Sequence, residues 1–218
     1  MRPLREVINS RSLVIIGASR NPSKPGAQLI KTLKASDFKG PLAGVNPQGG
    51  ELDGVKFYRS VGDVPFEVDL AVLVIPPESV PAAVAECAQR GVKGVVISSE
   101  GFAEAGPAGR EYQDQVKDIL HQSGMRGFGP NTLGLVNTET GLTTSYIAEP
   151  DMLKPGSIGF AAQSGIFVGA FLRYLSSIEG LGLSKGLGLG NKVDVDECDA
   201  LDFFAEDQQT RLVGLYLE

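Results

Sequence analysis

Several glycine-containing turns follow apolar strands in this chain, and the first of them has residues suited to binding phosphate. Residues 17–26 (GASRNPSKPG) join an apolar run, residues 12–17, to a segment with helical spacing, residues 26–36. Glycine lets a backbone approach a pyrophosphate, and free amides at the start of a helix attract anions. Arg20 and Lys24 add positive charge in a chain whose net charge is −6. The turn therefore predicts a phosphate-binding loop, with a plain tight turn as the alternative.

This turn departs from the two common nucleotide-binding patterns. A dinucleotide fingerprint has Gly-x-Gly-x-x-Gly and an acidic residue at the end of the second strand. Here the second glycine is missing from the expected place, and the second strand, residues 41–46, ends in Asn46-Pro47-Gln48. A Walker loop is absent as well. These departures argue against an NAD-linked oxidoreductase, which stays open only as a disfavoured alternative.

A second candidate phosphate site opens the last part of the chain. Residues 162–165 (AQSG) stand between a predicted strand, residues 157–162, and a predicted helix, residues 165–177. The start of a helix offers free amides and the positive end of the helix dipole, worth about 0.3–1 kcal/mol per surface charge. From spacing alone, an ordinary helix N-cap explains this tetrapeptide equally well.

The elements that position these turns alternate between strands and helices. Strands are predicted over residues 12–17, 41–46, 68–75, 93–98 and 126–128, and helices over residues 26–36, 78–89 and 107–122. The strands are continuous apolar runs, which are typical of parallel sheets covered on both faces. The pattern predicts an α/β fold with a Rossmann-like, doubly wound parallel sheet.

The alternation lapses between residues 129 and 155 and then resumes. We therefore predict a first domain over residues 1–130, a junction over residues 131–155 and a second α/β domain over residues 156–218. The second domain reads as strand, helix, strand, helix, strand. Because it ends on a strand with no covering helix, we expect it to be incomplete, with a terminal edge strand as the alternative.

Composition narrows the functional classes. Apolar residues make up 42% and charged residues 21%, which suffices for a globular core. The acidic balance argues against a nucleic-acid or membrane partner, and no apolar run approaches the ~18–20 residues needed to span a bilayer. Cys87 and Cys198 are too few for a disulfide framework, so we expect a reducing, cytoplasmic setting. We assign no residue to a metal site.

Five short motifs stand at the ends of predicted strands. They are Gly17-Ala18-Ser19, Val45-Asn46-Pro47, Ile75-Pro76-Pro77, Ser99-Glu100-Gly101 and Gly129-Pro130-Asn131. Each tripeptide is weakly specific, but the five in order, together with residues 162–165, extend over nearly the whole chain. In this order they resemble the NDP-forming acyl-CoA synthetases, the family of the succinyl-CoA synthetase α chain and of archaeal ADP-forming acetyl-CoA synthetase.

The resemblance implies a CoA-binding Rossmann-like domain followed by a truncated, flavodoxin-like ligase domain. It implies that the CoA phosphates lie against Gly17, Ala18, Ser19 and Arg20, with Lys24 nearby, and the nucleotide half against Asn46 and Pro47. It further implies an apolar wall of Ile75, Pro76 and Pro77, a pantetheine path along Ser99, Glu100 and Gly101, and a turn towards the thiol at Gly129, Pro130 and Asn131. We expect Glu100 to face amides or hydroxyls of CoA rather than its phosphates. A simple strand stop is the alternative for Pro76-Pro77.

In the ligase domain, the resemblance implies a site for a phosphate carried on a histidine. The residues that match this site are Gln163, Ser164 and Gly165. Glu218 matches the family's carboxylate that orients the imidazole and favours its charged form. The family's histidine lies downstream of the position matched by Glu218. His121, the only histidine of the chain, falls outside every motif, and we expect it on the surface.

Two positions depart from particular relatives. Gly169 stands where succinyl-CoA synthetases carry an aromatic hydroxyl, which argues against a preference for succinate. Thr132 stands where some relatives place a cysteine, so we expect no thiol chemistry there.

The function implied by the resemblance is that of the CoA-binding portion of an NDP-forming acyl-CoA synthetase. Such an enzyme converts a carboxylic acid, CoA and NTP into acyl-CoA, NDP and phosphate through acyl phosphate and phosphohistidine. NTP and Mg²⁺ are expected only on an ATP-grasp domain or β subunit, in a homo- or hetero-oligomer. Alone, these residues should bind CoA without turnover. An alternative of another class is a stand-alone or fused CoA-sensing regulatory module.

Overall fold

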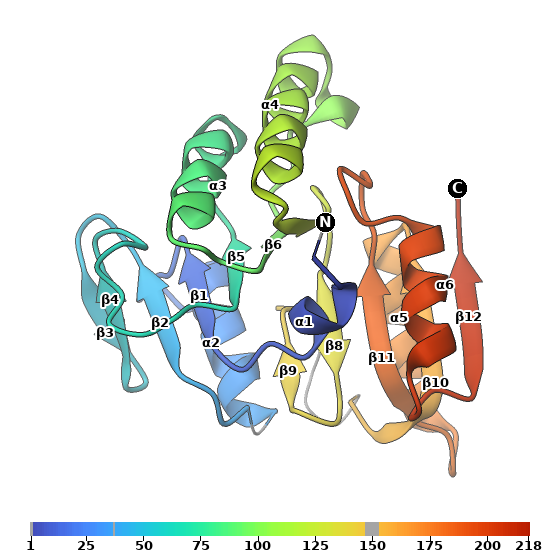
Figure 1. The fold of residues 1–218 in the computed structure, drawn as a ribbon. Coiled ribbons are helices and arrows are strands. Elements are labelled where there is room, and N and C mark those ends of the chain that lie inside the picture. The colour runs from blue at the N-terminus through green and yellow to red at the C-terminus, as the bar shows by residue number, and fades with distance from the viewer. Residues whose placement is uncertain (1, 37, 147–152) are drawn as a thin grey trace.

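A computed structural model describes residues 2–36, 38–146 and 153–218, with only the backbone described at residues 166–168. The chain forms two sheets that lie side by side (Figure 1). The strands of the first sheet are β1 (Leu13–Ile16), β2 (Leu42–Val45), β3 (Gly50–Leu52), β4 (Val55–Tyr58), β5 (Leu70–Leu73), β6 (Gly94–Ile97) and β7 (Arg126–Phe128). The strands of the second are β8 (Leu135–Asn137), β9 (Leu142–Thr143), β10 (Pro155–Ala162), β11 (Leu183–Gly188) and β12 (Leu212–Tyr216).

The first sheet is a parallel, doubly wound sheet with one antiparallel edge strand. Its order is β3-β4-β2-β1-β5-β6-β7, and only β3 runs antiparallel to its neighbour. Going outwards from β1, the chain first adds β2 and β4 on one side and then β5, β6 and β7 on the other. The order therefore reverses between β1 and β5, where open α/β sheets bind their ligands. The predicted α/β class is confirmed.

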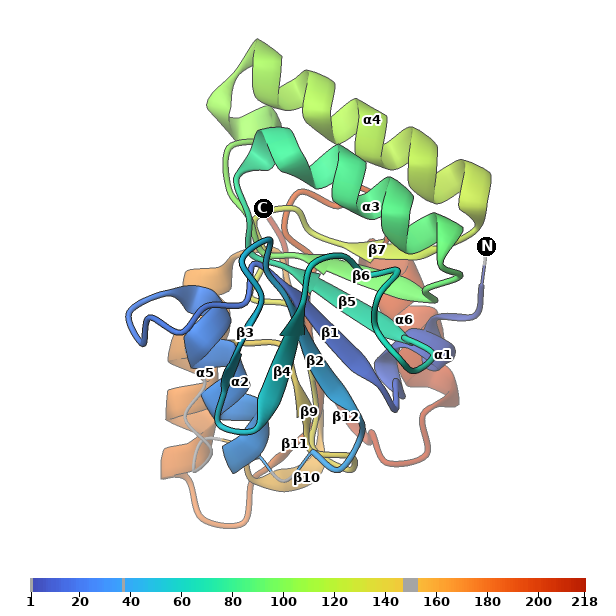
Figure 2. The ribbon, with the colours of Figure 1, turned by 90° about the vertical axis from the view of Figure 1, so that its left-hand side faces the viewer.

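Helices cover both faces of this sheet. They are α1 (Leu4–Ile8), α2 (Pro25–Ala35), α3 (Val80–Gln89) and α4 (Pro107–Ser123), with short 3-10 turns at Pro77–Ser79 and Ala103–Ala105. Alternate residues of β1 point to opposite faces: Leu13 and Ile15 pack with α1 and α2, while Val14 and Ile16 pack with α3 and α4. Figure 2 shows α3 and α4 together on one face of the sheet. Continuous burial of the strand explains its unbroken apolar sequence.

The second sheet combines three parallel strands with an antiparallel pair. Its order is β12-β10-β11-β8-β9, in which β8 runs antiparallel to β11 and to β9. The helix α5 (Gly165–Ser177) packs against β10 and β11, and α6 (Glu197–Glu206) packs against β10. The predicted strands and helices of this part of the chain are confirmed within two residues at each end.

Five elements were not predicted: α1 and the strands β3, β4, β8 and β9. Each is only two to five residues long, so periodicity carries little signal over its length. Strands β8 and β9 lie within residues 131–155, where the alternation lapses, and they extend the second sheet. Strand β9 pairs with β8, and β8 pairs with β11, a strand much later in the chain, which no local pattern encodes.

The last strand, β12, is an edge strand with exposed apolar side chains. Leu212 is 60% exposed, and Val213, Leu215 and Leu217 are also exposed. In Figure 1, β12 lies at the outer edge of the second sheet, away from the first sheet. That the second domain is incomplete stays a prediction.

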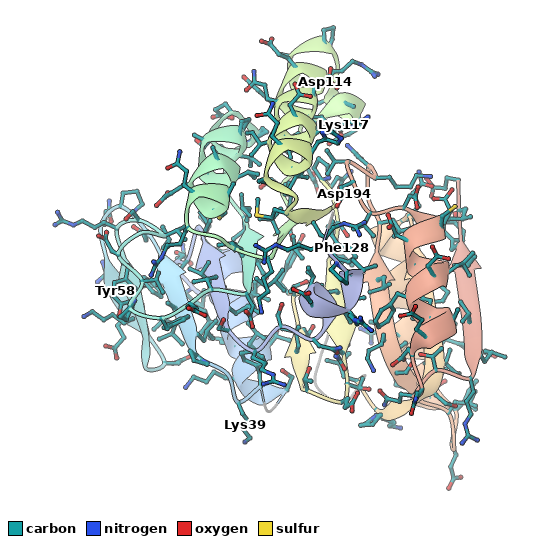
Figure 3. All side chains as sticks on the ribbon, in the orientation of Figure 1. Lys39, Tyr58, Asp114, Lys117, Phe128 and Asp194 are labelled. Carbon is teal, nitrogen blue, oxygen red and sulfur yellow. The ribbon has the colours of Figure 1, made fainter. Side chains whose placement is uncertain are left out.

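The two sheets share a core and meet along β7. Arg126, which is 5% exposed, pairs with Asp194 and Asp199, each at 2.8 Å. The backbone amide of Val193 donates to the carbonyl of Gly129 at 2.9 Å, so the segment after β11 runs beside β7. Asp194 also accepts the amide of Gly127, so it lies at the start of β7, and Figure 3 shows it beside α4, with Phe128 buried between the sheets. The carboxyl ends of strands from both sheets are therefore brought to one place.

Two observations bear on the expected setting of the protein. No helix among the described residues is long and apolar enough to cross a membrane. Both cysteines are free thiols: Cys198 is exposed, and burial raises the pKa of the Cys87 thiol to about 12. A reducing compartment therefore stays a prediction.

Candidate functional site

The turn after β1 packs directly against the turn after β5. Gly17 has a φ of +97°, and a Cβ at this position would lie 2.5 Å from the carbonyl oxygen of Val74. A Cβ at Gly26 would overlap the carbonyl oxygen of Gly17, so α2 begins in contact with the turn. Lys24, the N-cap of α2, makes no side-chain cap. Pro25 has no amide hydrogen, and the amides of Ala27 and Gln28 donate to the carbonyl of Lys24, so the amide of Gly26 is the one left open to an anion in this described turn.

In the turn after β1, which we call the first corner, some side chains hydrogen-bond the backbone and others are free to bind a ligand. Asn46 Nδ2 donates to the carbonyl of Ala18 at 2.8 Å, so this amide ties the turn after β2 to the turn after β1. Ser19 Oγ accepts the amide of Asn21 at 3.1 Å. Arg20 and Lys24 are exposed, and neither forms an ion pair within the described part of the chain. The two cations are therefore the available phosphate-binding groups.

The turns after β5 and β6 are joined by Ser99. Its Oγ donates to the carbonyl of Ile75 at 2.6 Å and accepts the amide of Ile75 at 3.2 Å. The hydroxyl of Ser99 is thus occupied by the backbone, and its neighbour Glu100 is exposed. Pro76 is exposed and Pro77 is half-buried against Gly101. This corner presents a small apolar surface with one carboxylate.

A cavity of about 510 Å³ opens between the two sheets at their carboxyl ends. It is lined by Ser98, Glu100, Glu104, Asn131, Thr132, Leu133, Tyr146, Gln163, Ser164, Gly165, Gly190, Asn191 and Glu218. The predicted site residues that it brings together are Glu100, Asn131, Gln163, Ser164, Gly165 and Glu218. Residues from the two predicted domains therefore form one pocket.

The other predicted site residues lie outside the lining of this cavity. They are Gly17, Ala18, Ser19, Arg20, Lys24, Asn46, Pro47, Ile75, Pro76, Pro77, Ser99, Gly101 and Pro130. They stand at the carboxyl ends of β1, β2, β5, β6 and β7 or immediately after them. The turns after these strands thus form a continuous row along the edge of the sheet, from β2 to the cavity.

The start of α5 forms the floor of the phosphate site predicted in the ligase domain. Ser164 is its N-cap and makes no side-chain cap, in contrast to α6, where Asp196 accepts from the amides of Cys198 and Asp199. The amide of Glu218 donates to Gln163 Oε1 at 3.2 Å, which brings the end of β12 to this helix start. The open amides and the helix dipole suit an anion.

The charge of the cavity is negative. Its described lining residues include three carboxylates, Glu100, Glu104 and Glu218, and no lysine, arginine or histidine. Burial and then the charge of Glu100 raise the pKa of Tyr146, so its hydroxyl remains a proton donor. An anion in this cavity would be held by neutral donors and amides rather than by cationic side chains.

Glu104 connects the two halves of the cavity. Burial acts to raise the pKa of its carboxyl, but hydrogen bonds from Asn191 Nδ2 and from the amides of Gly101 and Phe102 outweigh it and lower the pKa. The carboxylate is therefore ionised and fully engaged at neutral pH.

The lining residues that had no predicted role are Ser98, Glu104, Leu133, Tyr146, Gly190 and Asn191. Ser98 carries a buried hydroxyl with no partner within the described residues. Gly190 and Asn191 were not predicted, although they follow β11 and the rule that ligands bind beyond strand ends could have found them. Tyr146 lies in the predicted junction, where sequence offered no signal.

His121 lies apart from this site. It is exposed on α4, as predicted, and lines a different cavity of about 630 Å³ with Lys117, Lys192 and Asp194. The lysines and acids of that cavity come from α4, the segment after β11 and the start of α6. No group of three or more potential metal ligands occurs among the residues that the structure describes.

Two family models match the chain. Residues 11–138 match the CoA binding domain, and residues 155–218 match the succinyl-CoA ligase like flavodoxin domain. The two matches cover the first sheet with β8 and the three parallel strands of the second sheet, respectively.

Curated relatives and solved structures agree with these matches. The chain is 43% identical over 216 residues to acetate--CoA ligase [ADP-forming] II of Archaeoglobus fulgidus, covering 99% of this chain and 32% of that protein. It is 39% identical over 210 residues to the α subunit of acetate--CoA ligase [ADP-forming] II of Pyrococcus furiosus, covering 96% and 45%. It spans a third to a half of these relatives.

A solved structure gives the same overall picture. The dinucleotide-forming acetyl-coenzyme A synthetase 1 of Ca. Korarchaeum cryptofilum, in complex with phosphate and ADP, superposes with a TM-score of 0.93 at 36% identity, covering 100% of this chain and 46% of that one. The resemblance inferred from the strand-end motifs is confirmed, and neither the regulatory module nor the oxidoreductase finds support. The chain belongs to the CoA binding domain family, continued by a succinyl-CoA ligase like flavodoxin domain.

Proposed function

We propose that this chain holds coenzyme A across the carboxyl ends of its strands, as the CoA-binding part of an NDP-forming acyl-CoA synthetase. The observation that carries the proposal is the continuity of the site. The corners of the first sheet lead into a cavity that also contains the start of α5 and Glu218. A CoA-binding surface and an anion site thus adjoin each other.

The diphosphate of CoA would lie at the turn of residues 17–24, where Arg20 and Lys24 are free to pair with it. Charge-assisted hydrogen bonds of this kind are the stronger ones in proteins. The nucleotide half would follow towards Asn46 and Pro47, while pantetheine would pass the apolar surface at residues 75–77 and the loop at Glu100. Its thiol would then reach the cavity.

In the cavity, a phosphoryl group would sit at the open amides of Ser164 and Gly165. The reaction that this arrangement serves is acyl transfer: the thiol sulfur attacks the acyl carbon of an acyl phosphate, the C–O bond to phosphate breaks, and inorganic phosphate leaves. Glu218 would orient a histidine that carries the phosphoryl group. NTP and Mg²⁺ would bind on an ATP-grasp domain or β subunit in a cytoplasmic oligomer.

Each part of the chain would have its own role in this function. Residues 1–130 would form the CoA-binding domain, residues 131–155 the junction and residues 156–218 the ligase domain. The junction contributes Asn131, Thr132, Leu133 and Tyr146 to the lining of the cavity. Residues 131–155 would thus join the CoA-binding surface to the phosphoryl site.

Ligand-dependent melting tests the CoA site. A ligand at 100 times its dissociation constant adds ~2.7 kcal/mol of stability, so CoA should raise the melting temperature while NAD leaves it unchanged. A rise with NAD alone would overturn the proposal. Acyl-CoA formation by these 218 residues without an ATP-grasp partner would overturn the proposed division of labour.

A further inference from the structure

The two halves of the cavity are joined by one carboxylate. Glu104 Oε1 accepts the amides of Gly101 at 2.8 Å and Phe102 at 3.1 Å, both in the loop that follows β6. Its Oε2 accepts Asn191 Nδ2 at 2.6 Å from the loop that follows β11. Glu104, Glu100 and Asn191 all line the cavity.

The β6 side of this bridge is shaped by the carboxylate. Gly101 has a φ of +97° and packs against Pro77, so the loop turns sharply just after Glu100. The two amides that Glu104 accepts are the next donors along this loop. Loss of the carboxylate would free them and release the position of Glu100.

The β11 side is anchored independently. The amide of Asn191 donates to the carbonyl of Pro130 at 2.9 Å, and Asn191 Nδ2 donates also to Gln113 Oε1 at 3.0 Å. A Cβ at Gly190 would overlap the carbonyl oxygen of Pro130, so this loop sits tightly on the turn after β7. The side chain of Asn191 is therefore a fixed point for Glu104.

We propose that Glu104 is a positioning residue whose carboxylate sets the β6 loop, and with it Glu100, relative to the start of α5. The pantetheine path and the phosphoryl site are thereby coupled through the Glu104–Asn191 pair. This inference rests on the proposed function, since it concerns the path of CoA. Neither residue needs to touch the ligand for the coupling to act.

A charge-exchange experiment tests the pair. CoA affinity is measured by calorimetry for the 218-residue chain and for the variants Glu104→Ala, Asn191→Ala, Asn191→Asp and Glu104→Gln/Asn191→Asp. Asn191→Asp sets two carboxylates against each other and should weaken CoA binding most, by about 30-fold. Glu104→Ala should weaken it about tenfold. Glu104→Gln/Asn191→Asp restores an amide–carboxylate pair with reversed polarity and should recover affinity to within about threefold of the unaltered chain.

A matched control and a second readout complete the test. Glu111→Ala, at an exposed position of α4, should leave CoA affinity unchanged. Amide hydrogen exchange at Gly101 and Phe102 should speed up in Asn191→Ala, with or without CoA, while the melting temperature stays within a few degrees. Unaltered CoA affinity in Asn191→Asp, or no recovery in the double variant, would overturn the inference alone. If the unaltered chain bound no CoA, the proposed function would be overturned. If, in addition, amide hydrogen exchange at Gly101 and Phe102 were unchanged in Asn191→Ala, the inferred coupling would be overturned as well.

Discussion

Two helix starts in this molecule are open to an anion, but their surroundings differ in charge. At the start of α2, Arg20 and Lys24 are exposed cations beside an uncapped helix. At the start of α5, the amides are equally uncapped, yet the described lining of the cavity contains three carboxylates and no cationic side chain. The start of α6, by comparison, is closed by a capping box from Asp196.

The contrast indicates two different uses of one structural device. Fixed cations suit a polyanion that stays bound, as the CoA diphosphate would through a reaction cycle. Amides and a helix dipole among carboxylates suit a phosphoryl group that must arrive and leave, because the attraction is weak enough to be reversed. We therefore propose that the start of α2 is a holding corner, which keeps a polyanion bound, and that the start of α5 is a transfer corner, which binds a phosphoryl group transiently.

The largest expected effect comes from a matched pair of glycine substitutions at the two helix starts. In Gly26→Ala the new Cβ overlaps the backbone of Gly17, so a backbone shift is needed and we expect a loss of about 3 kcal/mol in the free energy of unfolding. In Gly165→Ala the new Cβ meets only the side chain of Leu133, at 3.1 Å, and we expect a change below about 1 kcal/mol. Urea unfolding measures both. Equal losses would show that the two corners are equally tight.

The next largest effect tests whether the cations at the start of α2 bind the phosphates of CoA. Arg20→Ala and Lys24→Ala should each weaken CoA binding about tenfold or more, since charge-assisted bonds are worth ~1.5–3 kcal/mol. A CoA fragment that lacks the phosphates should lose much less affinity, and Lys31→Ala, an exposed cation further along α2, should change neither. Calorimetric titration gives the affinities. Equal losses for both ligands would leave Arg20 and Lys24 without a phosphate-binding role.

The smallest effect concerns the pH dependence of the transfer corner. The pKa of Glu104 is lowered in the folded chain, so its contribution to stability is present above the unfolded value near 4.5 and is lost as the pH falls through the folded pKa. Because Glu104 is largely exposed, we expect less than about 1 kcal/mol between pH 7 and pH 3. Glu104→Gln should flatten this part of the profile of unfolding free energy. An unchanged profile would contradict the assigned hydrogen bonds.

Much of the fold and part of the site followed from local sequence. Apolar runs placed the main strands, and because parallel strands end at one edge, the motifs after them were expected to gather there. Gln163, Ser164 and Gly165 do so in the cavity, together with Glu218, which only the family resemblance had singled out. Ser99 and Asn46 show the limit of this reasoning, since their side chains brace neighbouring turns rather than facing a ligand.

The remainder depended on contacts between distant segments. Tyr146 reaches the cavity from the predicted junction, and Asn191 meets Glu104 across 87 residues of sequence. Strand β8 pairs with β11 from a distant part of the chain, and β9 extends the sheet by pairing with β8. Such pairings arise from packing of the two sheets, which periodicity does not report.

A crystal structure of this chain with coenzyme A tests the central claim most directly. We predict that the diphosphate lies at the turn of residues 17–24 beside Arg20 and Lys24, and that pantetheine passes Glu100 so that its thiol enters the cavity near Ser164. Coenzyme A bound at another face, or absent from these corners at saturating concentration, would contradict the account.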